Sequence, residues 1–122
     1  MNQREFVSIL DTRVAVSASQ GVMDQLASPS GRSPSRNLVR LSKWFNALQE
    51  SDKAAVKQVT RMVSYAATSD FLCILDGVAA VTEGGVGQFE LSFVTPEGRT
   101  ELEPGEDDLH DLFSELISQD IA

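Results

Sequence analysis

The chain has 122 residues, of which 42% are hydrophobic and 23% are charged, and its formal net charge at pH 7 is −8. This length and composition predict a single globular domain, which buries enough of its surface to fold without a disulfide or a metal. The strong negative charge argues against nonspecific binding to nucleic acid or to an anionic membrane.

The charge is unevenly divided along the chain. Residues 1–69 contain nine Lys or Arg and five Asp or Glu, whereas residues 83–122 contain eleven acids and a single base, Arg99. Charge that is separated in this way is either neutralised when the two halves pack together or presented to another molecule. The division is therefore the main clue to a partner.

The only cysteine, Cys73, lies in the apolar run 71–75, which predicts a buried thiol in a reducing compartment. Residues 1–5 lack the basic lead and the apolar core of a signal peptide. No apolar run approaches the roughly 20 residues that cross a bilayer. We therefore expect a cytoplasmic protein that does not associate with membranes.

Apolar residues at steps of three or four predict a helix over residues 3–26, and Gly21 marks residues 17–21 as the place for a break. Residues 28–35 are small, polar or proline, and they predict a mobile surface loop. The predicted inward face of the helix consists of Phe6, Val7, Leu10, Val14, Ala18, Val22 and Leu26.

A second helix is predicted over residues 36–49, and a third begins at Ser51, which suits an N-cap. The short break between them predicts that they pack as antiparallel neighbours. The inward face of the second helix is predicted to contain Leu38, Leu41, Trp44, Phe45 and Leu48, and that of the third Val56, Val59, Val63, Ala66 and Ala67.

Residues 71–77 are compatible with two structures. Helical spacing continues through Leu75, and Gly77 could end the third helix in the left-handed conformation. Asp76 and Gly77 between two apolar runs are also a hairpin signal, which would make residues 71–75 a strand. The alanines at 66 and 67 favour the helix, which we take as the prediction, with the strand as the alternative.

Three strands are predicted, over residues 78–82, 89–93 and 99–102. Apolar and polar residues alternate in the middle strand, and Pro96 with Gly98 predicts a turn between the second and third strands. Together they form a three-stranded antiparallel meander.

The last helix is predicted to begin at the three acids of residues 106–108, which stabilise the positive end of a helix dipole. Its apolar stripe consists of Leu109, Leu112, Phe113, Leu116, Ile117 and Ile121. The order of helices, a small antiparallel sheet and a final helix predicts one α+β domain over residues 1–122.

No motif in the sequence predicts catalysis, a cofactor or a metal. His110 is the only histidine, and no serine or cysteine stands in a recognisable nucleophile motif beside it. The acids around it lack the spacing of calcium loops, and zinc sites need more His or Cys. The glycines at 84–87 lack the Lys-Ser/Thr of a phosphate loop and precede a strand.

Two features of the second helix can be explained either by binding to another molecule or by packing within the chain. Arg36, Arg40 and Lys43, extended by Arg32, form a basic stripe that we expect to face the acidic C-terminal half rather than nucleic acid. The adjacent aromatic pair at 44–45 is predicted to lie in the core, with an exposed binding patch as the alternative.

Residues 41–117 resemble a set of small, acidic, uncharacterised bacterial proteins, some of which are suspected immunity partners of delivered toxins. The resemblance is carried by residues 41–48, 71–78, 89–91 and 109–113. It implies a toxin-binding protein of the α+β class, and it carries over no catalytic residue.

Charge and resemblance together predict a non-catalytic protein that neutralises a protein partner, such as a cognate toxin with a basic cleft. An acidic surface attracts basic partners and can imitate a phosphate backbone. The alternatives are a nucleic-acid mimic that inhibits a DNA- or RNA-binding protein and, third, an enzyme centred on His110; direct nucleic-acid binding is not expected. The chain is expected to be a monomer or a homodimer, with the strand 99–102 as one pairing edge. The predicted partner contacts are Glu90, Glu101, Glu106, Asp107, Asp108, His110 and Asp111.

Overall fold

The computed structural model describes residues 1–79, 82–85 and 87–121, with side chains up to residue 118. Its elements are α1 (Gln3–Leu10), η1 (Asp11–Val16), α2 (Ser17–Ala27), α3 (Arg36–Asn46), α4 (Glu50–Asp76), β1 (Leu91–Thr95), β2 (Gly98–Glu103) and α5 (Leu109–Ile121). The chain is therefore α+β, as predicted. No helix of the described residues combines the length and the apolar character needed to span a membrane.

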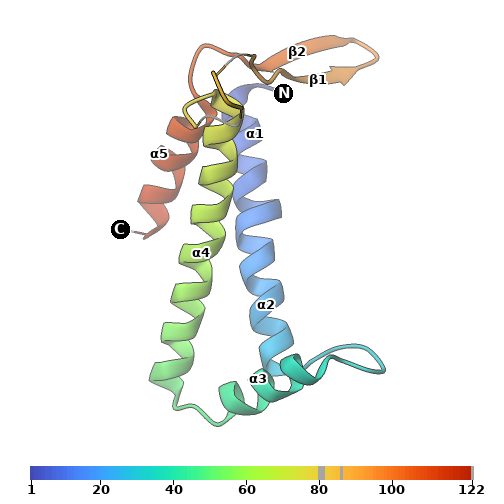
Figure 1. Ribbon diagram of the computed structural model, residues 1–122, viewed down its shortest axis with the longest axis vertical. Coiled ribbons are helices and arrows are strands. Elements are labelled where there is room, and N and C mark those ends of the chain that lie inside the picture. Colours follow the sequence, from blue (N-terminus) through green and yellow to red (C-terminus); the bar gives the residue numbers. More distant parts are fainter. Residues whose placement is uncertain (80–81, 86, 122) are drawn as a thin grey trace.

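Two long helical rods lie side by side and set the shape of the molecule (Figure 1). One rod is formed by α1, η1 and α2, and the other is α4, whose 27 residues span about 40 Å. At one end α3 crosses beside α2, and at the other end α5 packs against α1 and α4. The hairpin of β1 and β2 projects from the end that carries α5.

The N-terminal rod begins with a capping box, in which Asn2 accepts from the N–H of Glu5 and the Glu5 carboxylate accepts from the N–H of Asn2. The rod runs through Gly21 without the predicted break. Its irregularity is instead the π-helical segment η1, and there the Ser64 hydroxyl of α4 donates to the carbonyl of Ala15. This bond ties the two rods together at the irregular turn.

The third predicted helix is confirmed through residues 71–75. Gly77 ends α4 in the left-handed conformation, with φ of 78°, which excludes the strand alternative. The helix begins one residue before Ser51, with Gln49 at the N-cap. The predicted antiparallel pairing with α3 is wrong, because the antiparallel neighbour of α4 is the N-terminal rod.

Among the residues that the structure describes, the sheet has two strands where three were predicted. β1 pairs antiparallel with β2 across the predicted turn, with Thr95 opposite Gly98. Residues 78 and 79 and Thr82 are not in a strand, and the rest of the predicted first strand lies outside the described residues. A bulge lies between Leu91 and Ser92, which pair with Glu103 and Glu101 respectively.

The main core lies where α1, α4 and α5 meet. Tyr65 of α4 and Phe113 of α5 are in ring contact, with their centroids 6.2 Å apart. Leu102 carries the end of β2 into the same end of the molecule and is also buried. The buried cluster consists of Val7, Ala15, Tyr65, Leu72, Leu109, Leu112 and Phe113. This core fixes the end of the molecule that holds the predicted contacts.

Away from this core, two predicted inward faces are exposed. Val14 and Val22 of the N-terminal rod lie opposite Val59 and Val63 of α4, and all four are solvent-exposed because α5 does not extend over them. Trp44 of α3 is exposed as well, whereas its neighbour Phe45 is buried. The aromatic pair is therefore divided between surface and core.

The basic stripe does not face the acidic half of the chain. Arg36, Arg40 and Lys43 lie on α3, at the opposite end of the rods from the hairpin and the start of α5 (Figure 1). The expected pairing of this stripe with the acidic C-terminal half is therefore wrong, although Arg4 of α1 does form an ion pair with Glu115 of α5. The molecule has a basic end and an acidic end.

Candidate functional site

The exposed carboxylates of the C-terminal half gather on the hairpin and on the first turn of α5, together with the loop before it. We call this region the acidic end. Within it, Arg99 forms an ion pair with Glu101, with Nε and Oε1 2.9 Å apart, and this pair lowers the pKa of Glu101. The exposed acids of the acidic end are Glu90, Glu97, Glu101, Glu106, Asp107, Asp108 and Asp111.

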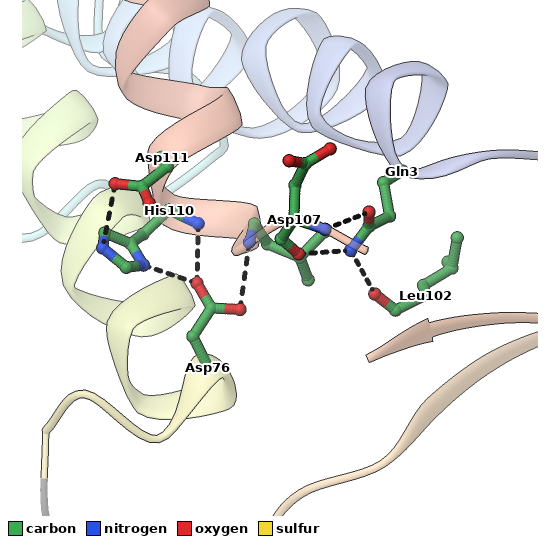
Figure 2. A network of polar contacts seen from close by, with 7 residues as sticks. Gln3, Asp76, Leu102, Asp107, His110 and Asp111 are labelled. Atoms are coloured by element: carbon green, nitrogen blue, oxygen red, sulfur yellow. Dashed lines mark hydrogen bonds and ion pairs between the residues drawn. The ribbon is translucent and has the colours of Figure 1, made fainter. Parts of the chain in front are cut away.

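Asp76, the last residue of α4, caps α5 from outside that helix (Figure 2). Its carboxylate accepts from the N–H groups of Leu109 at 3.0 Å and His110 at 2.7 Å. These groups belong to the first turn of α5 and have no partner within that helix. The side chain of Asp76 is fully buried, so the capping bonds are shielded from water.

His110 is held between two carboxylates. Its Nδ1 lies 2.6 Å from Oδ2 of Asp76, and its Nε2 lies 3.3 Å from Oδ1 of Asp111 (Figure 2). The bond to Asp76 raises the pKa of His110; partial burial opposes this shift, and the charge of Asp111 adds to it. An imidazolium can donate to both carboxylates at once, which no neutral tautomer can do. The position of the ring between two carboxylates therefore favours the protonated histidine as a bridge.

Glu103 is buried close to this bridge. Desolvation, followed by its hydrogen bond to Asp76 and the charges of Asp76 and Asp108, raises the pKa of Glu103 to about 8. Burial also raises the pKa of Asp76, but the hydrogen bonds from Glu103, His110 and Leu109 outweigh that effect and lower it. Asp76 is the anion of the cluster, and Glu103 is its protonated neighbour at neutral pH.

The bulge between the strands explains why Glu103 is inside. Regular alternation would bury Leu102 and expose the next residue, yet both are buried. A bulge breaks the alternation and redirects side chains. Oε2 of Glu103 is one of the buried oxygens of the described residues without a hydrogen-bond partner.

Gln3 holds the loop before α5 against the N-terminal rod (Figure 2). Its Nε2 donates to the carbonyls of Leu102 at 2.9 Å and Asp107 at 2.7 Å, and its Oε1 accepts from the N–H of Asp107 at 3.2 Å. A Cβ at Gly105 would overlap the Gln3 amide, so a larger residue there would displace the side chain that makes these bonds. The backbone of Asp107 is fixed while its carboxylate remains free to face solvent.

The predicted contact residues are only partly brought together. Asp108, His110 and Asp111 offer ligand atoms within 4.8 Å of one another. Glu90 and Glu101 lie on the hairpin, outside that group. Because both ring nitrogens of His110 already engage carboxylates, a cation would have to displace one of them. The group therefore suits a charged bridge better than a metal centre.

Three residues of this site were missed from the sequence. Asp76 stands at the end of a helix, where a carboxylate opposes the helix dipole, and this local conflict was the available signal. Gln3 and Glu103 gave no signal, since one depends on a contact across 99 positions and the other on the bulge.

Two kinds of structure therefore meet at this end of the molecule. One is a clasp formed by the buried side chains of Asp76 and Glu103 with the partly buried His110, and the other is a set of exposed carboxylates. The clasp has no free imidazole nitrogen to accept a proton from a substrate. Comparison of the chain with protein-family models, curated proteins and solved structures gave no match.

Proposed function

We propose that this chain is a non-catalytic binding protein that neutralises a basic protein partner, as an immunity protein does with its toxin. The contact surface would be the acidic end. The observation that carries the proposal is the placement of these carboxylates: they are exposed, and the basic stripe of α3 lies at the other end of the molecule. Arg99 and His110 partly compensate Glu101 and Asp111, and the charge of the other exposed carboxylates is available to a partner.

The geometry of the loop at 104–108 adds a second support. Gln3 fixes its backbone through two bonds to Asp107, and Asp76 fixes the first turn of α5. Carboxylates on an ordered backbone lose little further entropy when a partner binds them. The resemblance of residues 41–117 to suspected immunity proteins points to the same class.

The proposal is tested with the product of the adjacent reading frame as the candidate partner. We expect a complex with the wild-type chain, and we expect the triple change Glu106→Lys, Asp107→Lys and Asp108→Lys to weaken it about 100-fold, because like charges would then face each other. Isothermal titration calorimetry measures both affinities.

A matched control is available at the opposite end of the rods. The triple change Asp24→Lys, Glu50→Lys and Asp52→Lys alters the net charge by the same amount on exposed residues of α2 and α4. It should leave the affinity within about threefold of wild type, since these charges lie more than a Debye length from the acidic end. Equal losses in the two triple variants would contradict the proposal.

The same complex separates the alternative function from the leading one. A nucleic-acid mimic occupies the oligonucleotide site of its partner, so an added oligonucleotide would compete with the chain for that partner. An immunity protein that covers a cleft which does not bind nucleic acid shows no such competition. An enzyme centred on His110 would lose an assayable activity in His110→Ala while its fold is retained.

A further inference from the structure

We propose that a second copy of this chain binds the exposed apolar face of the two helical rods, so that the protein is a homodimer in solution. This helical face lies away from the acidic end and is independent of the proposed function. Its central part is a groove of about 470 Å³ between the N-terminal rod and α4, lined by Val14, Ala18, Ser19, Val22, Val59, Thr60, Val63, Ser64, Ala67 and Thr68.

None of these ten lining residues carries a charge. The hydroxyl groups among them are turned back onto helix carbonyls: Thr60 donates to Val56, and Thr68 donates to Ser64. Ser19 does the same with Val16. The hydroxyl hydrogens are thereby used within the chain, and the surface offered to solvent is mostly methyl groups. Such a surface gains free energy when it leaves water.

The groove continues toward α3. A second apolar depression shares Val59 and Thr60 with it and extends to Ala55, Val56 and Trp44. An exposed tryptophan at the edge of an apolar face is typical of a binding surface. The face thus includes residues from the N-terminal rod, α4 and α3, which is broad enough for two helices of a partner.

The surface area of the chain favours a partner of dimer size. A compact monomer of this mass exposes about 6,450 Å², whereas this chain exposes 8,520 Å². The excess is about 2,000 Å², and burying half of it on each of two chains gives an interface of about 2,000 Å² in total. Stable homodimers begin at about this size.

The uncharged lining argues against the basic partner as the occupant of the groove and suits a second copy of the same apolar face. A basic surface would find no carboxylate among the lining residues of the groove. Two identical uncharged faces can pair about a two-fold axis while the charged groups of both chains stay hydrated. Valine and alanine allow the helices to approach closely, so the two layers would form a four-helix arrangement.

The test is the mass of the full chain at about 100 μM, measured by light scattering, in the wild type and in Val63→Glu. We expect the wild type to be a dimer. In the variant, the dissociation constant of the dimer should be at least about 100-fold higher, because the change buries two like charges at the two-fold axis. Glutamate favours a helix more than valine does, and residue 63 is 63% exposed, so the monomer should keep its fold, as circular dichroism can verify.

Val94→Glu is the matched control, because Val94 is 66% exposed but lies on β1. It should remain dimeric. A monomeric wild type, or a dimer that Val94→Glu disrupts and Val63→Glu does not, would overturn the proposal. Salt gives a second readout: screening the repulsion between two chains of charge −8 should strengthen the dimer.

Discussion

At the scale of single residues, the cluster of Asp76, Glu103 and His110 binds protons more tightly than the ordinary pKa values of Glu103 and His110 would allow. Glu103 is buried next to an anion, so it retains its proton to about pH 8. The hydrogen bond between the His110 ring and Asp76 raises the pKa of His110. Both groups bind protons more tightly in the folded chain than in the unfolded one. Stability is therefore linked to pH.

The free energy of unfolding should fall as the pH rises from about 5 to about 8. In the unfolded chain Glu103 ionises near its ordinary pKa of 4.5, whereas in the folded chain it ionises only at about 8, so raising the pH between these values favours unfolding. His110 contributes with the same sign above its ordinary pKa of 6.5. Over this range we expect Glu103 to contribute about 1–3 kcal/mol of the loss.

Glu103→Gln removes the ionisation and keeps a hydrogen-bond donor for Asp76. Urea unfolding at several pH values should therefore show a flatter profile in this variant. Glu101→Gln is the control, since Glu101 is two residues away but exposed and paired with Arg99, and it should retain the wild-type slope. A slope in Glu103→Gln equal to that of the wild type would show that Glu103 is not the linked group.

At the scale of elements, the boundaries of the helices could be predicted from local sequence signals, whereas the packing of the helices against one another could not. Gly77 ended α4 where predicted because a left-handed residue terminates a helix by its own backbone preference. The partner of α4 could not be inferred from the short loop before it, because α3 turns across the rods rather than folding back along them. In the described part of the first predicted strand no pairing forms, as Val78 and Ala79 continue directly from the helix end.

The attachment of α5 depends on Asp76. We expect Asp76→Ala to lower the free energy of unfolding by about 2–4 kcal/mol, because it removes the cap of α5 and leaves His110 beside Glu103 without its anion. Asp70→Ala, an exposed change on the same helix, should cost less than about 0.5 kcal/mol. Chemical denaturation measures both values, and amide exchange should rise at the first turn of α5 in Asp76→Ala alone. Equal costs for the two variants would contradict the capping role.

At the scale of the whole molecule, the sequence patterns of the two rods correctly predicted apolar helix faces. These faces were wrongly predicted to lie in the core of the single chain. Val14, Val22, Val59 and Val63 recur with helical spacing, yet the single chain leaves them exposed. A sequence pattern marks a face as suited to burial and does not say which molecule covers it. The same holds for the charges, whose separation was visible in the sequence while their positions at opposite ends depend on the course of α3.

The central claim is that the acidic end presents negative potential to a basic partner. The most direct measurement is the rate of association with the product of the adjacent reading frame, followed by stopped flow as the salt concentration is raised from about 50 mM to about 500 mM. We predict that the rate constant falls at least about tenfold, and that the Glu106–Asp108 lysine variant has a lower rate with little dependence on salt. A rate that is independent of salt in the wild-type chain would contradict the claim.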